Sequence, residues 1–340
     1  MDRFRQAEEG ELAAVYALRG RAFAGTGGDP AGDRAAWFAA HDRDDPWRAA
    51  GANYVATRDG RVVATARIFA RRIRLGAGDV AVACFGDVAT DPPYQGRGYM
   101  RRLLAFVNEQ NAAHGFALGL LATGSPGAYA GAGFRVVPVP WYALDLPLPD
   151  RASARADATV REATRGGRWS IAPPAAARPE GMRAVYEAFG RGRPGYPVRD
   201  DALWAHLAGT LQASPPAWLG LAVDSGGTVG AYLIAVSPGR NPRGLTILEC
   251  PYTAGAEDAA HLLMAALATD PDVLGAGWPS IGGALPGDHA LFATDAPLPG
   301  RRGMAEYLML RPYTPQGTRA EATLRRESAG RFIYWLGDNV

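Results

Sequence analysis

The chain has 340 residues, of which 36 are basic and 34 acidic, so its formal net charge at neutral pH is +2. This balance gives no support to a partner such as nucleic acid or an anionic membrane surface, and no apolar run approaches the ~18 residues of a membrane helix. Hydrophobic residues make up 48% of the chain, which is enough for the cores of about two domains.

Cysteine and histidine usage also narrows the function classes. Cys84 and Cys250 lie far apart in apolar runs, so we expect buried thiols rather than a disulfide. The histidines show no metal-ligand spacing, so we expect no metal site. Residues 1–8 lack the apolar core of a signal peptide, and we therefore expect a cytoplasmic protein with a composition typical of bacteria.

In chain order, the first clear element is a β-hairpin. Tyr54–Thr57 and Val62–Ile68 read as strands, and Asp59-Gly60 between them is a strong turn signal.

The run Asp87–Leu104 reads as a strand, a turn with two prolines, a Gly-Arg-Gly loop and a helix. Backbone N–H groups at a helix start lack partners inside the helix, and the helix dipole makes that end positive. Gly96 and Gly98 have no Cβ, so a phosphate can come close to the backbone, and Arg97 adds a full charge. The run predicts a pyrophosphate site and hence a nucleotide-containing cofactor.

Two common phosphate loops are excluded here. The run lacks the Gly-x4-Gly-Lys-Ser/Thr spacing of a P-loop, and it lacks the three glycines of a dinucleotide fold. Instead, Gln95–Met100 resembles the acetyl-CoA loop of the GNAT acetyltransferases, Gln/Arg-x-x-Gly-x-Gly/Ala, with Met100 where Gly or Ala is usual. A second motif of that family, Tyr-x-x-x-Gly-Phe, matches Tyr129, Gly133 and Phe134 after a strand-like run at 116–122.

The second half of the chain repeats this order of elements. Strands at 218–223, 228–235 and 245–250 precede a helical pattern at 257–268, but Pro251–Ala256 stands where the pyrophosphate loop would be. The Pro-punctuated, small-residue segment before it reads as a linker. We therefore expect a mixed α/β (α+β) fold with two GNAT-like domains, each a mostly antiparallel twisted sheet flanked by helices, the second without a CoA loop. The expected boundaries are 1–147 for the catalytic domain, 148–158 for the linker, 159–313 for the degenerate domain and 314–340 for a tail packed on both.

A further resemblance concerns Arg191–Asp200 and Trp204, which are similar to an Arg-Pro-Gly…Trp stretch in the enhanced-intracellular-survival (Eis) acetyltransferases. Those enzymes join a catalytic GNAT domain to a degenerate one and end in a third domain, for which too few residues follow here. In them the C-terminal carboxylate reaches the active site, which makes Val340 a candidate for that role.

The resemblance implies an acyl-CoA donor, acetyl-CoA or a longer acyl-CoA, and a set of residues around it. Tyr129 matches the acid tyrosine that protonates the departing thiolate. Backbone groups of the strand before the loop would pair with the pantetheine arm and polarise the thioester carbonyl. The implied cofactor-binding residues are Val88, Ala89, Gln95, Gly96, Arg97, Gly98, Tyr99, Met100, Arg101 and Arg102.

The general base and the acceptor stay open. Asp87 is the acidic residue of the strand before the loop, and it is either the base or a carboxylate paired with an arginine. Glu249 occupies the corresponding strand of the second half and could line a cleft. The run Asp42–Asp45 either attracts cationic amines or is a solvated loop, and Trp141 with Tyr142 either caps an acceptor pocket or closes the core.

The leading function is therefore N-acyl transfer to a primary amine of a small molecule. A CoA-binding sensor or scaffold without activity, and a thioester hydrolase or decarboxylase on the same fold, remain as alternatives. The sequence also leaves a homo-oligomer open.

Overall fold

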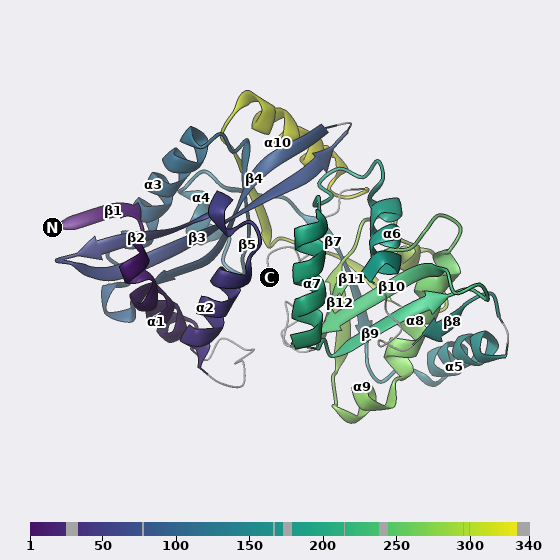
Figure 1. Cartoon of the computed structure of the whole chain (residues 1–340). Coiled ribbons are helices and arrows are strands. Elements are labelled where there is room, and N and C mark those ends of the chain that lie inside the picture. The colour runs from purple at the N-terminus through teal and green to yellow at the C-terminus, as the bar shows by residue number, and fades with distance from the viewer. Residues whose placement is uncertain are drawn as a thin grey trace.

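The structure is a computed structural model, and it describes residues 1–24, 33–76, 78–165, 167–172, 179–213, 215–237, 244–294, 296–298 and 300–331. Two twisted sheets of seven strands stand side by side, each with helices packed against it (Figure 1). Four hydrophobic clusters form the cores, three of them around the first sheet. The mixed α/β fold with two similar halves agrees with the expectation from the sequence.

The first sheet is antiparallel except for one parallel pair, β4 with β5. Asp59 and Gly60, both with positive φ, make the tight turn of the expected hairpin between β2 and β3. The strands in spatial order are β1 (Asp2–Gln6), β2 (Ala52–Arg58), β3 (Arg61–Leu75), β4 (Gly78–Thr90), β5 (Leu118–Ala122), β14 (Leu308–Pro312) and β6 (Arg135–Val136).

Helices cover both faces of this sheet because its strands alternate their side chains between the faces. On β2, Tyr54 and Ala56 join the cluster under α3, whereas Val55 joins the cluster under α1. α10, from the far end of the chain, packs on the face opposite α3 (Figure 1). The helices of this half are α1 (Leu12–Ala22), α2 (Arg34–Asp44), α3 (Tyr99–Ala113), α4 (Gly127–Ala130) and α10 (Pro315–Glu327), with short 3-10 turns η1 (Glu9–Glu11), η2 (Arg48–Ala50) and η3 (Pro92–Tyr94).

The second sheet has the same parallel pair in its middle, β11 with β12. In spatial order its strands are β13 (Arg301–Ala305), β7 (Val139–Asp145), β12 (Ser280–Ala284), β11 (Leu245–Glu249), β10 (Val229–Val236), β9 (Trp218–Val223) and β8 (Ser170–Ala172). Its helices are α5 (Asp150–Thr164), α6 (Pro179–Gly190), α7 (Asp201–Ala213), α8 (Glu257–Thr269) and α9 (Pro271–Gly275), with the 3-10 turn η5 (Ala290–Phe292).

The two sheets exchange strands, which the sequence did not reveal. β14 lies in the first sheet between β5 and β6, and β7 lies in the second sheet between β12 and β13. We had expected the two domains to divide at residue 147, but the division between the sheets does not follow that boundary. The chain crosses from one core to the other within β7, since Val139 packs in the first core and Tyr142 is fully buried in the second.

The residues expected to form a linker, 148–158, lie mostly in α5. Pro149 precedes this helix and Asp150 begins it, so the proline that suggested a connector marks a helix start. Ala152 and Ala156, one helical turn apart, are buried in the second core. The small residues of this segment thus form a packed helix face.

The segment Arg191–Asp200 holds the two halves together. Its backbone pairs with the far end of β3: Arg74 N donates to the Tyr196 carbonyl (2.7 Å), and Val198 N donates to the Arg72 carbonyl (2.8 Å). The indole N–H of Trp47 donates to Asp200 (2.9 Å). The stretch that resembles the Eis enzymes therefore docks the second half onto the first.

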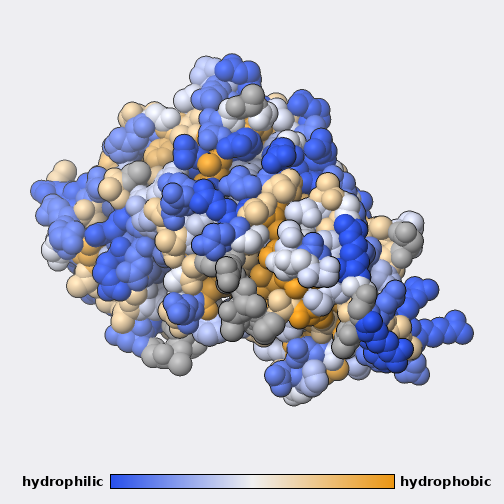
Figure 2. Space-filling view, turned by 45° about the vertical axis from the view of Figure 1, so that its right-hand side comes forward, coloured by the Kyte–Doolittle hydropathy of each residue, from blue (hydrophilic) through white to orange (hydrophobic). Residues whose placement is uncertain are grey.

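On the face that Figure 2 shows, hydrophilic side chains cover much of the surface and hydrophobic ones gather toward its middle. Among the described residues, no helix is long and apolar enough to cross a membrane. Cys84 and Cys250 are both buried and form no disulfide with each other, as expected.

Candidate active site

The Gly-Arg-Gly loop adopts a conformation that only glycine takes without strain. Gly96 and Gly98 both have φ +74°, and a Cβ on Gly96 would meet no atom within 4 Å, so the space beside it is open. Gly98 is the N-cap of α3 and offers no side chain to the first N–H groups of the helix. Those N–H groups are left for an external anion.

A groove lies along the end of β4, beyond the point where its neighbour β5 ends. Their parallel pairing covers only Val82–Phe85, yet β4 continues to Thr90 and β5 ends at Ala122. β4 residues beyond Phe85 pair with β3 on one side, and no described strand lies on the other. An extended chain could bind that free edge as an added strand.

A pocket of about 450 Å³ joins this groove to the glycine loop. Its walls come from the end of α1, the end of β4, the loop with the start of α3, and α4. The lining residues are Ala22, Phe23, Val88, Ala89, Thr90, Tyr94, Gln95, Gly96, Gly98, Tyr99, Met100, Arg101 and Ala128.

The three arginines of the loop region differ in how far they are already paired. Arg102 is bound to Asp2 (2.9 Å), lies over the Tyr99 ring and does not line the pocket. Arg97 and Arg101 are exposed and form no ion pair with a described carboxylate. Arg101 lines the pocket, and the Arg97 guanidinium lies 5.4 Å from the ring centre of Tyr94, another lining residue. Two cations thus remain free beside the helix start.

The sequence of this region matches a family model described as an acetyltransferase (GNAT) domain, over residues 3–137. Residues 3–137 are a GNAT acetyltransferase domain. Both predicted motifs lie within this GNAT domain, and acetyl-CoA is the co-substrate of the family. A comparison with curated proteins found no match to the chain.

Solved structures share the fold of the whole chain. A probable N-acyltransferase of unknown function from Enterococcus faecalis V583 is 18% identical over 93% of this chain and 74% of its own, with a TM-score of 0.66. Eis1 from Mycobacterium abscessus is 17% identical over 92% and 74%, with a TM-score of 0.59. A tandem GNAT protein from the clavulanic acid biosynthesis pathway is 17% identical over 93% and 99%, with a TM-score of 0.54. The chain therefore has the fold of two GNAT-like domains in tandem.

Tyr129 of the GNAT domain lies on α4, beyond the end of β5. It is half-buried and packs edge-on against Phe134, and its neighbour Ala128, not Tyr129 itself, lines the pocket. Burial raises the pKa of Tyr129, an effect that a hydrogen bond with Thr123 opposes. Its hydroxyl therefore keeps its proton at neutral pH. The glycine of the same motif, Gly133, has φ +83° and lies against Arg311 of β14.

Met100, which departs from the family pattern, is compatible with the structure of the loop. Its side chain lines the pocket and packs against the core under α3. Tyr99 lines the pocket as well, but its hydroxyl is used by Asp2 and Arg58.

Asp87 lies at a bulge of β4 and forms an ion pair with Arg19 of α1 (3.3 Å). Val340, the other candidate catalytic residue, lies outside the described residues. No group of histidine, cysteine or acidic side chains that could hold a metal occurs among the described residues.

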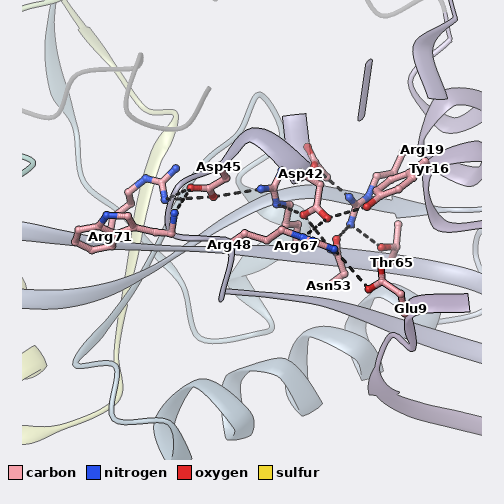
Figure 3. A network of polar contacts seen from close by, with 12 residues as sticks. Glu9, Tyr16, Arg19, Asp42, Asp45, Arg48, Asn53, Thr65, Arg67 and Arg71 are labelled. Atoms are coloured by element: carbon pink, nitrogen blue, oxygen red, sulfur yellow. Dashed lines mark hydrogen bonds and ion pairs between the residues drawn. The ribbon is translucent and has the colours of Figure 1, made fainter. Parts of the chain in front are cut away.

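Asp42 and Asp45 neither face an entrance nor form a solvated loop; they are buried (Figure 3). Arg67, itself 2% exposed, pairs with both, at 3.0 Å from Asp42 and 3.2 Å from Asp45. Arg71 binds Asp45, and Arg48 binds Asp42. These acidic residues balance buried arginines, which is why they lie inside the protein.

Asp42 should make the stability of the protein sensitive to acid. Burial pushes the pKa of Asp42 up, but Arg67, Tyr16, Asn53 and Arg48 outweigh it, so the pKa lies below its usual value. The resulting stability is complete above the unfolded pKa of about 4 and is lost as the pH falls through the lower folded pKa. We expect Asp42→Asn to lower the free energy of unfolding by about 3 kcal/mol at neutral pH, because it leaves Arg67 partly unpaired. Urea unfolding should show this gap shrinking toward about pH 3; a gap independent of pH would contradict the assignment.

In the second half, the end of β11 corresponds to the end of β4, and buried side chains occupy the space beside it. Glu249 at the end of β11 is 1% exposed and bound by Arg199 and by the Tyr232 hydroxyl, so it lines no cleft. His289 is buried there: its Nε2–H donates to the Cys250 carbonyl (2.7 Å), and its Nδ1 accepts from Leu291 N (3.2 Å). Burial lowers the pKa of His289 to about 4, which agrees with this neutral tautomer.

Trp141 and Tyr142 close the core of the second half and cap no acceptor pocket. Tyr142 is buried in the second core, and Trp141 packs against Tyr307 and Gly282.

Two residues of this region were not predicted from the sequence: Phe23, which lines the pocket, and Arg19, which pairs with Asp87. A signal for Arg19 was available, because it follows Val15 by four residues and so falls on the apolar stripe of α1.

Proposed function

We propose that the chain is an acyl-CoA-dependent N-acyltransferase, with acetyl-CoA as the simplest donor and a primary amine of a small molecule as acceptor. The observation that carries the proposal is the pocket in which an open glycine loop, an uncapped helix start and Arg101 lie at the unpaired edge of β4, with Arg97 beside it.

The residues present fit an acyl-CoA. The pyrophosphate would bind the N–H groups of the loop and the first turn of α3, with Arg97 and Arg101 supplying charge. The pantetheine arm would lie along the free edge of β4. The amides of Val88 and Ala89 would then meet the thioester carbonyl, where negative charge develops during acyl transfer.

The transfer itself needs little from the protein beyond position and one proton. The lone pair of a neutral amine attacks the thioester carbon, the C–S bond breaks, and the electron pair leaves with sulfur. Tyr129 is the proposed donor of the proton that the thiolate takes up, and it regains a proton from water. The proton lost by the amine passes to water, because the Asp87 carboxylate is held in its ion pair with Arg19.

The acceptor class rests on the family and on the names of the structural neighbours. Those names describe N-acyltransferases and N-acetyltransferases, which transfer to nitrogen. Within the pocket, Phe23, Val88 and Ala89 make an apolar wall beside the end of β4. Such a wall suits the carbon skeleton of a small amine better than a highly charged substrate.

The deciding experiment measures release of CoA thiol from acetyl-, propionyl- and longer acyl-CoAs, with and without a panel of primary amines. Release that depends on an amine, together with mass-spectrometric detection of the amide, would support the proposal. Release without any amine would instead favour thioester hydrolysis or decarboxylation. Binding of acyl-CoA without release from any donor would favour a sensor.

A further inference from the structure

A bulge in β4 sets the direction of the backbone at the pocket. Thr65 of β3 lies opposite Ala89, whereas Arg67 lies opposite Gly86, so two β4 residues face one residue of β3. Such an insertion bends a strand and turns its backbone groups away from the ladder. The two residues that share this position are Asp87 and Val88, at the edge where the pocket begins.

Asp87 holds an unusual backbone conformation, with φ +52°. Among the described residues other than glycine, only Asp59 shares a positive φ, and it lies in a tight hairpin turn where such angles are the rule. Asp87 lies within a strand. A side chain in this region of the backbone map persists only where its surroundings hold it there.

Arg19 makes the contacts that keep Asp87 in this conformation. Its side chain is fully buried and reaches from α1 into the sheet, where Nη2 donates to Asn53 Oδ1 (2.7 Å) and to Thr65 Oγ1 (3.0 Å), as Figure 3 shows. Its Nη1 lies 3.3 Å from Asp87 Oδ2. One planar guanidinium thus joins β2, the β3 residue beside the bulge, and the bulge itself.

We propose that Arg19 and Asp87 form a clamp that holds the β4 bulge open and thereby aims the amides of Val88 and Ala89 at the thioester; this rests on the proposed function. Asp87 Oδ2 is buried and accepts no hydrogen bond from a described residue, so Arg19 is its compensation. Without Arg19 the carboxylate, whose side chain is only 14% exposed, would lose its ion-pair partner, and it would turn away and release the bulge. Arg19 is in this sense a positioning residue.

The clamp can be separated from a role of Asp87 as base by a double variant. Arg19→Met removes the guanidinium and keeps an unbranched side chain in the core. Asp87→Gly removes the orphaned charge, and glycine adopts a positive φ without strain. A clamp predicts that Arg19→Met/Asp87→Gly regains what Arg19→Met alone loses. A general base predicts that the double variant stays inactive.

Two measurements are made on the wild type, Arg19→Met, the double variant and the control Arg5→Met. Arg5 forms an ion pair with Glu11 in the same domain, away from the pocket. The first measurement is amide hydrogen exchange of residues 86–90 in the ligand-free protein. The second is the affinity for acetyl-CoA by calorimetry, followed by turnover with an amine substrate.

We expect the backbone amides of residues 86–90 to exchange faster in Arg19→Met, and we expect this variant to bind acetyl-CoA about tenfold more weakly. This factor corresponds to the free-energy cost of holding one residue in a strained backbone conformation. The double variant should regain most of this affinity and turnover, and Arg5→Met should behave as wild type. Unchanged exchange and affinity in Arg19→Met, or a double variant that binds acetyl-CoA but does not turn over, would overturn the clamp. A wild-type protein that does not bind acetyl-CoA would instead overturn the proposed function. In that case the amide exchange of residues 86–90 in wild type and Arg19→Met would still test whether Arg19 holds the bulge.

Discussion

Replacing Gly98 with Asp is expected to weaken binding of acetyl-CoA by about 100-fold, through repulsion of the pyrophosphate and strain at a left-handed residue. Gly98 has φ +74° and is the N-cap of α3, so a carboxylate on its Cβ would stand where the helix start and Arg101 attract an anion. Calorimetric titration with acetyl-CoA measures the effect directly.

Two further variants separate charge from strain in this test. Gly98→Ala adds the Cβ without the charge and should lose only part of the affinity. Gly115→Asp places the same side chain at φ +82° just beyond the other end of α3, far from the loop, and should destabilise the fold without affecting binding. Equal affinity in Gly98→Asp and the wild type would refute the pyrophosphate cradle.

Tyr129→Phe is expected to lower turnover by about 10²-fold while leaving the affinity for acetyl-CoA nearly unchanged, as is usual for loss of a positioned acid. Burial raises the pKa of Tyr129, so the hydroxyl is a proton donor across the neutral range. The measurement is steady-state thiol release in the presence of the amine found by the panel.

The control for this variant is Tyr54→Phe, which removes the hydroxyl of another buried tyrosine of the same domain, on β2 and outside the pocket. It should retain activity. Full activity in Tyr129→Phe would remove Tyr129 from the mechanism and leave protonation of the thiolate to water.

The local elements of the site could be predicted because their signals lie within short stretches of sequence. The Asp-Gly turn, the Gly-Arg-Gly loop and the start of α3 each follow from the conformational freedom of glycine and from helix capping. The second family motif then added Tyr129, whose neighbour Ala128 lines the pocket. Residues named on these grounds mostly line one pocket, with Arg97, Arg102 and Tyr129 beside it.

The contacts between distant segments could not be predicted in this way. Whether the acidic residues of a run such as Asp42–Asp45 are solvated depends on what packs against them, and here Arg67 and Arg71 of β3 pair with Asp42 and Asp45 while Asp44 stays exposed. The bulge at Asp87 likewise depends on Arg19, which is 68 positions away in the sequence. The partners of β7 and β14 are set by packing between sheets, which no local pattern records.

The exchanged strands bear on how this protein can fold. A fragment ending near residue 147 would lack β14, and so would expose the edge of β5, while its own β7 would have no partners. Unpaired edges of this kind recruit other chains and promote aggregation. The first sheet therefore cannot be completed before β14, the last strand, has been synthesised, and the second sheet needs both β7 and β13, which lie at opposite ends of the second half in the chain. We expect calorimetry to show both halves melting in a single cooperative transition.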